Sequence, residues 1–376
     1  MEPLNPFLVN GYYGPDYFCD RNKETDSLIN NSNNGINTTL LSIRRMGKTG
    51  LLQHVVHELH RRKKGIGIYV DIFDTENLKD FTNSLATAIF KTFPQKNRLW
   101  KSTMDLFKNL RPVISYDELT GTPEVTLDYS QPKQFEHSLL NIFNFLERNN
   151  RLIILAIDEF QQITNYPEKN VEAFLRSRIQ ELKNVKFIFS GSSPHLLTQM
   201  FHHANRPFFA STQTLFLDKI AYDEYARFIL ESFQKHKKKI NNEAIDFILK
   251  FSLQHTFYTQ AVCNRIFASG NKKITLPDAQ TAAFELLNQN EPVFFQYRTM
   301  LTNNQWNMLR AIAKEGAVYQ PHAQKLIQKY NLGTPSSVQR NIEALLNKEM
   351  IYKLSDNKSE YYRVYDCFLM RWLERS

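Results

Sequence analysis

Thr38-Thr-Leu-Leu-Ser-Ile-Arg-Arg-Met-Gly-Lys-Thr49 indicates an apolar strand that runs into a tight loop, and the helix-forming run Leu51–Leu59 follows at once. A strand, a loop and a helix N-terminus in this order direct backbone N–H groups and the positive end of the helix dipole toward an anion. The usual pattern is G-x-x-x-x-G-K-[ST], and Ser42 stands at its first glycine. We therefore predict a phosphate-binding loop. A chance Gly-Lys-Thr in an ordinary loop is the alternative.

Two side chains of this loop have assigned tasks in such a site. Lys48 would reach the outer phosphates, and the Thr49 hydroxyl would hold a magnesium ion. The loop residues expected at the nucleotide are Ser42, Arg44, Arg45, Met46, Gly47, Lys48, Thr49 and Gly50.

A second apolar run, Arg151–Phe160, contains two adjacent carboxylates near its end. Its unalternating Leu and Ile residues predict a central parallel strand that is buried on both faces. Asp158 and Glu159 would then lie in the crevice where open α/β sheets bind ligands. Asp158 would bind Mg²⁺ through water, and Glu159 would polarise the water that attacks the γ-phosphate. A strand that ends in a solvated acidic turn is the alternative.

Composition places the chain among folded globular proteins. It has 376 residues, 42% of them hydrophobic, and a formal net charge of +9. This charge permits nucleic-acid contact, although scattered surface lysines would produce the same value. We expect no signal peptide and no membrane span, and three isolated cysteines are consistent with a reducing cytosol. A cytoplasmic location is expected.

Strands and helices alternate over the first two thirds of the chain, which predicts an α/β fold of the P-loop NTPase type with a doubly wound, parallel, five-stranded sheet. The strands are expected at Thr38–Ser42, Gly65–Asp71, Leu152–Ile157, Lys186–Ser190 and Thr214–Leu217. We expect an ATPase core at 1–217, a helical lid at 218–295 and a winged-helix domain at 296–376.

One segment, at about 111–129, does not fit the alternation and reads as a β-hairpin insertion. It would either contact a partner or cap the fold.

The last segment has the winged-helix order of three helices followed by a two-stranded hairpin. The helices are expected at Asn304–Lys314, Pro321–Tyr330 and Ser336–Lys348, and the strands at Ile351–Leu354 and Tyr361–Val364. The third helix would expose polar side chains that suit DNA reading, a protein-docking wing or an ordinary solvated face. These residues are Ser336, Ser337, Gln339 and Arg340.

Six segments lie in order along nearly the whole chain: Tyr17–Glu24, Arg44–Thr49, Ile157–Gln161, Phe189–Ser193, His255–Gln260 and Tyr365–Trp372. Together they resemble the archaeal-type ATPase family, which is close to the STAND and Orc/Cdc6-like branches of the AAA+ NTPases.

The resemblance implies further roles. Phe18 and Arg21 look like the segment packed near adenine, and Ser190 stands where the family has its sensor-1 polar residue. His255 lies at the lid position that relatives pack toward the nucleotide, although a core histidine is the alternative. Arg206 resembles an arginine finger, which would act on a neighbouring subunit; an ordinary surface arginine is the alternative.

The leading functional hypothesis is a Mg²⁺-dependent ATPase that acts as a nucleotide-controlled switch or a DNA-associated motor. ATP and ADP, rather than guanine nucleotides, are implied by the resemblance. A nucleotide-binding regulator or scaffold with negligible turnover is the alternative. Expected partners are duplex DNA or a protein at the winged helix, and a nucleotide-dependent homo-oligomer.

Overall fold

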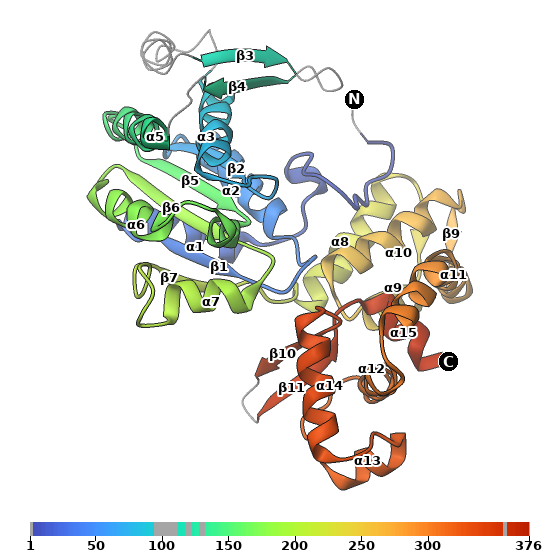
Figure 1. Ribbon diagram of the computed structural model, residues 1–376. Helices are drawn as coiled ribbons and strands as arrows, with labels where there is room; N and C mark the ends of the chain where they lie inside the picture. Colours follow the sequence, from blue (N-terminus) through green and yellow to red (C-terminus); the bar gives the residue numbers. More distant parts are fainter. Residues whose placement is uncertain (1–2, 94–111, 117–121, 128–131, 356–358, 376) are drawn as a thin grey trace. The chain divides into compact units, whose positions relative to one another are not determined.

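The computed structural model describes residues 3–93, 112–116, 122–127, 132–355 and 359–375 (Figure 1). The chain forms two compact units. One is Gly11–Lys219, and the other combines the residues before Gly11 with those from Ile220 onward.

The first unit is built on a parallel sheet of five strands in the order β2-β5-β6-β1-β7. The strands are β1 (Thr38–Leu41), β2 (Ile66–Asp71), β5 (Ile153–Asp158), β6 (Val185–Ser190) and β7 (Gln213–Phe216). Each begins within one residue of its predicted start. The predicted five-stranded parallel sheet is therefore confirmed, and β1 lies in its interior beside β6.

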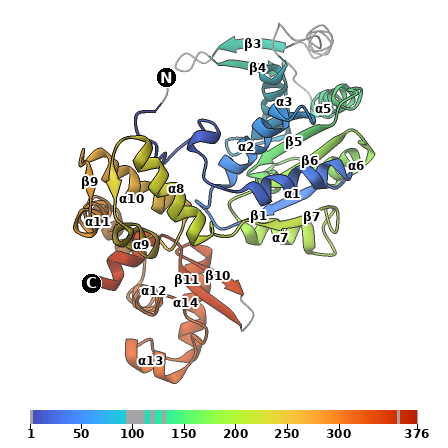
Figure 2. The ribbon, with the colours of Figure 1, turned by 180° about the vertical axis from the view of Figure 1, so that it is seen from behind.

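Helices cover both faces of this sheet. They are α1 (Asn22–Asn33), α2 (Lys48–Arg61), α3 (Leu78–Thr92), α5 (Pro132–Glu147), α6 (Val171–Glu181) and α7 (Pro194–His202), with the short 3-10 helices η1 (Pro15–Tyr17) and η2 (Phe160–Asn165). The helices α1 and α2 supply one apolar layer (Figure 2). The helices α3, α5, α6 and α7 supply the other.

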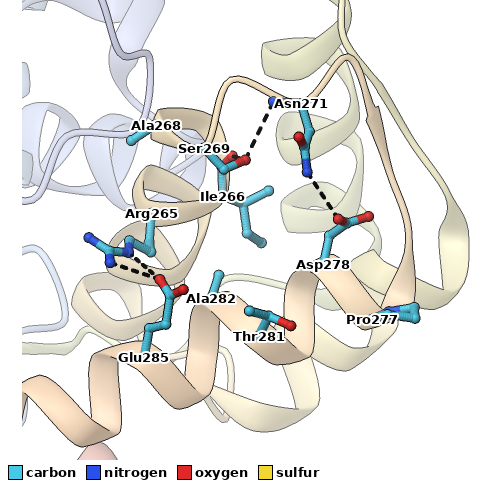
Figure 3. Close-up of a pocket in the computed structure, with 10 residues that line it drawn as sticks. All are labelled: Arg265, Ile266, Ala268, Ser269, Asn271, Pro277, Asp278, Thr281, Ala282 and Glu285. Carbon is cyan, nitrogen blue, oxygen red and sulfur yellow. Dashed lines mark hydrogen bonds and ion pairs between the residues drawn. The ribbon is translucent and has the colours of Figure 1, made fainter.

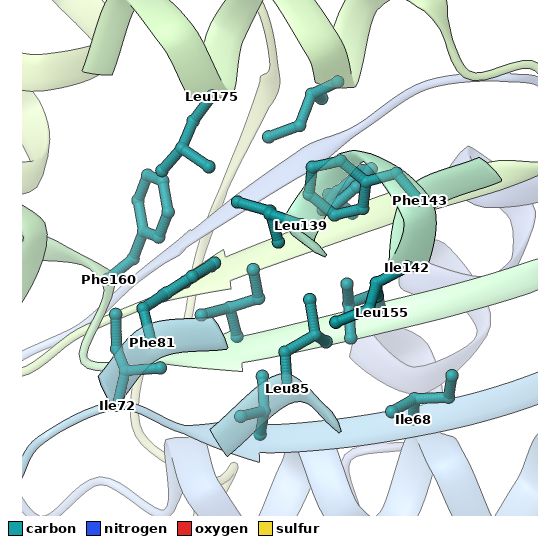
Figure 4. Packing of buried hydrophobic residues seen from close by; sticks show 14 of the residues in the cluster. Ile68, Ile72, Phe81, Leu85, Leu139, Ile142, Phe143, Leu155, Phe160 and Leu175 are labelled. Atoms are coloured by element: carbon teal, nitrogen blue, oxygen red, sulfur yellow. The ribbon is translucent and has the colours of Figure 1, made fainter. Parts of the chain in front are cut away.

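The interior strand β5, between β2 and β6, is buried along its whole length and sends alternate side chains into the two layers. Leu155 joins the layer of α3 and α5 (Figure 4), whereas Ile154 and Ala156 join the layer of α1 and α2. This two-sided burial explains why the sequence of the strand is continuously apolar rather than alternating. It also fixes where the acidic residues at its end emerge.

The inserted hairpin consists of β3 (Pro112–Tyr116) and β4 (Pro123–Leu127), which pair antiparallel. The predicted hairpin also included residues 111, 117–121 and 128–129, which lie outside the described residues. Val125 and Leu127 of β4 are buried in the layer that contains α3. The Thr87 hydroxyl accepts from Val125 N at 2.9 Å, and Asn83 Oδ1 accepts from Leu127 N at 3.0 Å, so α3 side chains satisfy the edge of β4.

The second unit begins with helices α8 (Tyr222–Lys235), α9 (Asn242–Phe251), α10 (Thr256–Ala268) and α11 (Leu276–Met300) and the two-residue strands β8 (Lys239–Ile240) and β9 (Lys273–Ile274). Phe7, from the N-terminal segment, packs against Phe233 of α8 with ring centroids 4.8 Å apart. The helical lid was expected to end at 295, but its last helix, α11, continues through Pro292 to Met300. Phe294, just beyond the proline, is buried, and this packing holds the helix together where one backbone donor is missing.

The C-terminal part has the predicted winged-helix order. It contains α12 (Asn303–Glu315), α13 (Gln324–Tyr330), α14 (Pro335–Asn347), β10 (Ile351–Ser355), β11 (Glu360–Val364) and α15 (Cys367–Arg375). β10 and β11 pair antiparallel. Arg371 of α15 donates to the carbonyl oxygens of Lys250 at 2.7 Å and Phe251 at 2.8 Å, and so caps the end of α9. Among the described residues, no helix is both long and apolar enough to cross a membrane.

Candidate functional site

The loop between β1 and α2 turns sharply into the first turn of the helix. Gly47, the N-cap of α2, has a φ of 90°, which favours glycine. Arg45 also has a positive φ, of 65°, whereas Ser42 does not. The Ser42 hydroxyl instead donates to the Ile43 carbonyl at 3.0 Å. Serine at the first glycine position therefore carries no backbone strain here.

Lys48 is buried at the first turn of α2. Its Nζ donates to the carbonyl oxygens of Ile43 at 3.2 Å and Ser42 at 3.4 Å, both in its own loop. Burial lowers the pKa of Lys48, while the negative charges of Asp158 and Glu159 act in the opposite direction. The ammonium group thus lies in a desolvated position where it would interact strongly with an anion.

Thr49 and Asp158 meet directly. The Thr49 hydroxyl donates to Asp158 Oδ2 at 2.6 Å, and the Tyr69 hydroxyl donates to the same oxygen at 3.4 Å. A hydroxyl and a carboxylate oxygen side by side are the hard donors that Mg²⁺ prefers, and phosphate oxygens usually complete such a site. In the described part of the chain, no group of three or more His, Cys, Asp or Glu side chains could hold a metal ion by itself. The residues present therefore fit a magnesium ion that binds together with a nucleotide.

Glu159 follows Asp158 with a φ of 57°, so the backbone turns sharply at the end of β5. Its Oε2 atom accepts three hydrogen bonds: from Gln161 Nε2 at 2.5 Å, from the Ser192 hydroxyl at 2.8 Å and from Ser192 N at 3.0 Å. A Cβ on Gly191 would lie 1.8 Å from Gln161 Oε1, so only glycine admits the Gln161 side chain at this point. The carboxylate is held firmly by residues on two strand ends.

Ser190 ends β6, the strand next to β5 in the sheet, and is fully buried. Its hydroxyl has no hydrogen-bond partner among the described residues. Ser190 therefore lies at the same edge of the sheet as Asp158 and Glu159, where Gln161 Oε1 also has no hydrogen-bond partner among the described residues.

The segment before α1 reaches the loop through two residues. Arg21 is buried, pairs with Glu24 at 2.9 Å, and donates to the Met46 carbonyl at 3.4 Å. Phe18 stacks on His54 of α2, with ring centroids 4.3 Å apart. A Cβ on Gly50 would lie 3.4 Å from the Phe18 ring, so Phe18 covers the first turn of α2.

The remaining loop residues, Arg44 and Arg45, are exposed, whereas Met46 is buried. The contacts of two further predicted site residues involve other parts of the chain. Arg206 forms an ion pair with Glu172 of α6. His255 belongs to the second unit, where it is buried at the N-cap of α10 and contacts Tyr258 with ring centroids 5.0 Å apart. Their roles at a nucleotide stay predictions.

Sequence reasoning missed three residues that contact the acidic pair. Gln161 and Ser192 lie inside segments that were recognised as motifs, but their hydrogen bonds to Glu159 depend on the neighbouring strand ends. Tyr69 carried no signal, because a tyrosine in a strand normally indicates packing alone.

Acid should destabilise the segment that covers α2. Burial lowers the pKa of His54, with the positive charges of His57, Arg62 and Arg61 adding to this effect and Glu58 opposing it. The Tyr12 hydroxyl is bonded to its Nδ1 at 2.8 Å. The folded state favours neutral His54, so stability is lost as the pH falls below about 6.5, where the unfolded chain takes up a proton.

We expect the thermal midpoint to fall less between neutral and acid pH in His54→Asn than in the wild type, because asparagine can still accept from Tyr12 without titrating. His203→Asn, at an exposed histidine, is the matched control. An identical acid loss in His54→Asn and the wild type would contradict the assignment.

Comparison with known proteins agrees with this geometry. A family model described as an ATPase domain predominantly from Archaea matches residues 18–253, and one described as a probable winged helix domain matches 292–375. No curated protein matches the sequence.

Solved structures share the whole fold. The chain is similar to the Walker-type ATPase paby2304 of Pyrococcus abyssi, with 17% identity, 98% of this chain and 99% of that one covered, and a TM-score of 0.67. The ORC2 protein of Aeropyrum pernix in ADPNP–ADP complexes is 15% identical, with 99% and 96% covered and a TM-score of 0.59. The ORC1 protein of Aeropyrum pernix in complex with DNA is 13% identical, with 100% and 97% covered and a TM-score of 0.53. These likenesses confirm the predicted fold class, and at such identities they show the fold alone.

Proposed function

Because the chain belongs to the family of ATPase domains found predominantly in Archaea, we propose that it binds ATP with Mg²⁺ and hydrolyses it to ADP and phosphate. The observation that carries this proposal is the hydrogen bond between Thr49 and Asp158 beside a buried Lys48. Membership of the family makes nucleotide binding plausible; turnover is our inference from the acidic pair.

Each residue has a proposed task. The Lys48 ammonium neutralises the outer phosphates, while Thr49 and Asp158 hold the metal, whose charge stabilises the negative charge that develops in phosphoryl transfer. Glu159 orients and deprotonates the attacking water. Its Oε2 is held by Gln161 and Ser192, which leaves Oε1 as the atom to receive the proton. Phe18 and Arg21 lie near the base, and the Ser190 hydroxyl contacts the γ-phosphate or the water.

A regulator with negligible turnover is the second candidate. One observation favours it: hydrogen bonds from Gln161 and Ser192 already occupy one oxygen of the Glu159 carboxylate, which restricts how this group can approach a water molecule. In that case the bound nucleotide would set the state of the protein without being consumed.

We also propose that the winged helix binds duplex DNA. The ORC1 protein, which shares the fold, was solved in complex with DNA. Gln339 and Arg340 on α14 are exposed, so they can reach base edges or phosphates. A protein partner at the same helix is the alternative outcome.

Substitution of the two charged residues should separate binding from chemistry. We expect Lys48→Ala to abolish ATP binding, because the main positive charge of the cradle is lost. Glu159→Gln should retain ATP binding and lose turnover by about a hundredfold or more, since general base catalysis contributes on the order of 10²–10⁴. Binding is measured with a fluorescent ATP analogue and turnover by phosphate release.

The controls are thermal unfolding of both variants and turnover without Mg²⁺. Normal turnover in Glu159→Gln would refute the role of Glu159. Tight ADP retention with no turnover by the wild type would favour the regulator.

DNA binding should depend strongly on salt. Each phosphate contact contributes about 0.9 to the slope of log K against log salt, so Arg340→Ala should reduce the slope by about 1 between roughly 50 and 200 mM salt. Arg176→Ala, at a partly exposed arginine of α6, is the control and should leave the slope unchanged. Salt-independent binding, or an equal effect of both substitutions, would count against DNA at this helix.

A finger role for Arg206 requires assembly. We expect the mass of the protein in solution to increase with ATP but not with ADP, and Arg206→Ala to lose turnover while it retains ATP binding. Glu172→Gln removes the ion-pair partner and is the comparison. If Arg206→Ala and Glu172→Gln have the same effect on turnover, the arginine is structural.

A further inference from the structure

A cavity of about 560 Å³ lies between the end of β2, the helix α3 and the inserted strand β4. Glu124, Val125 and Thr126 form its β4 wall, and Asp71 contributes from the strand end. Asp71 is the register partner of Asp158, so the cavity begins next to the candidate nucleotide site in the same unit. Cavities of this size accommodate small ligands or single side chains.

The charges around this cavity are unbalanced. Four carboxylates line it, from Asp71, Asp74, Asp80 and Glu124, against the single cation of Lys91, so the formal charge is −4 + 1 = −3. Within the described residues none of the four carboxylates forms an ion pair. Like charges around one hollow repel one another, and a bound cation would relieve this repulsion.

An aromatic side chain accompanies the carboxylates. Phe73 lines the cavity and is 62% exposed, although it follows directly on a buried strand of the core. An exposed phenyl ring beside carboxylates can stack on a planar cation. A phenyl ring buried in the core has no face free for such a contact. The aromatic wall is a second feature, independent of the charge, that selects the same class of ligand.

Another cavity, of about 460 Å³ between α10 and α11, shows the contrast (Figure 3). Its charged groups already have partners: Arg265 pairs with Glu285 at 2.8 Å, and Asp278 accepts from Asn271 at 3.0 Å. That hollow does not require a charged ligand.

We propose that the cavity beneath the inserted hairpin binds a guanidinium group, which stacks on Phe73 while its N–H groups donate to the carboxylates. Guanidinium suits this site better than ammonium, because it is planar, weakly hydrated and able to form paired hydrogen bonds to carboxylates. The group would belong to a small molecule such as agmatine or to an arginine residue of a peptide. This inference goes beyond the proposed function and does not rest on it, because it requires no nucleotide.

The test is a ligand-observed NMR titration of the full chain, without nucleotide, at low ionic strength. The probes are agmatine and the blocked peptide acetyl-Gly-Arg-Gly-amide. The same peptide with citrulline in place of arginine is the uncharged control. We expect saturable binding of a guanidinium probe and none of the citrulline peptide. Preference for agmatine indicates a free small molecule, and preference for the peptide indicates an arginine residue of a partner.

Two pairs of variants locate the site. The double substitution Asp74→Asn, Glu124→Gln should weaken binding about tenfold or more, because two exposed carboxylates are neutralised without a change of size. Phe73→Leu should weaken it about two- to fivefold through the lost cation–π contact. The controls are Glu181→Gln and Phe216→Leu, at exposed residues that do not line the cavity.

No saturable binding by the wild type, equal binding of the citrulline peptide, or equal losses in the control variants would overturn the proposal. Because both neutralised carboxylates are exposed, these substitutions leave the core intact, and thermal unfolding verifies this.

Discussion

The hydrogen bond between Thr49 and Asp158 joins two residues that lie 109 positions apart in the sequence. The candidate site in the first unit depends on the strand arrangement that brings these two residues together. Thr49 is held by the loop that β1 feeds into α2, and Asp158 by the end of β5. Their meeting requires β1 and β5 to end at one edge of a parallel sheet, with only β6 between them. Two apolar layers, one on each face, hold β5 in that central position.

The two charged groups at this edge are held in different ways. Desolvation lowers the pKa of Lys48, whereas the negative charges of Asp158 and Glu159 act in the opposite direction. Glu159 is only partly buried, and Gln161 and Ser192 donate hydrogen bonds to its carboxylate. Hydrogen bonds within the protein thus preorganise the site. The Lys48 ammonium group donates to the carbonyl oxygens of Ser42 and Ile43, and a bound phosphate would take their place as acceptor.

The inserted hairpin forms a two-stranded sheet of its own beside α3 and leaves the five-stranded sheet uninterrupted. Side chains of α3 satisfy the backbone of β4 and bury Val125 and Leu127, so the insertion packs as part of the fold. Together with α3 and the end of β2, the strand β4 also lines a hollow that includes Asp71. The two interpretations left open by the sequence, a structural cap and a contact surface, are therefore compatible.

Local patterns alone determined the strands, most of the helices, the strand–loop–helix order of the candidate site and the winged-helix order, because each follows from apolar periodicity or from a loop between two periodic segments. The family followed from motifs spread along the chain. Only the tertiary structure decided the sheet order, the hydrogen bond from Ser192 to Glu159, the ion pair of Arg206 and the continuation of α11 through Pro292. These features depend on contacts between residues far apart in sequence, whose packing outweighs local preference, and no local pattern encodes such contacts.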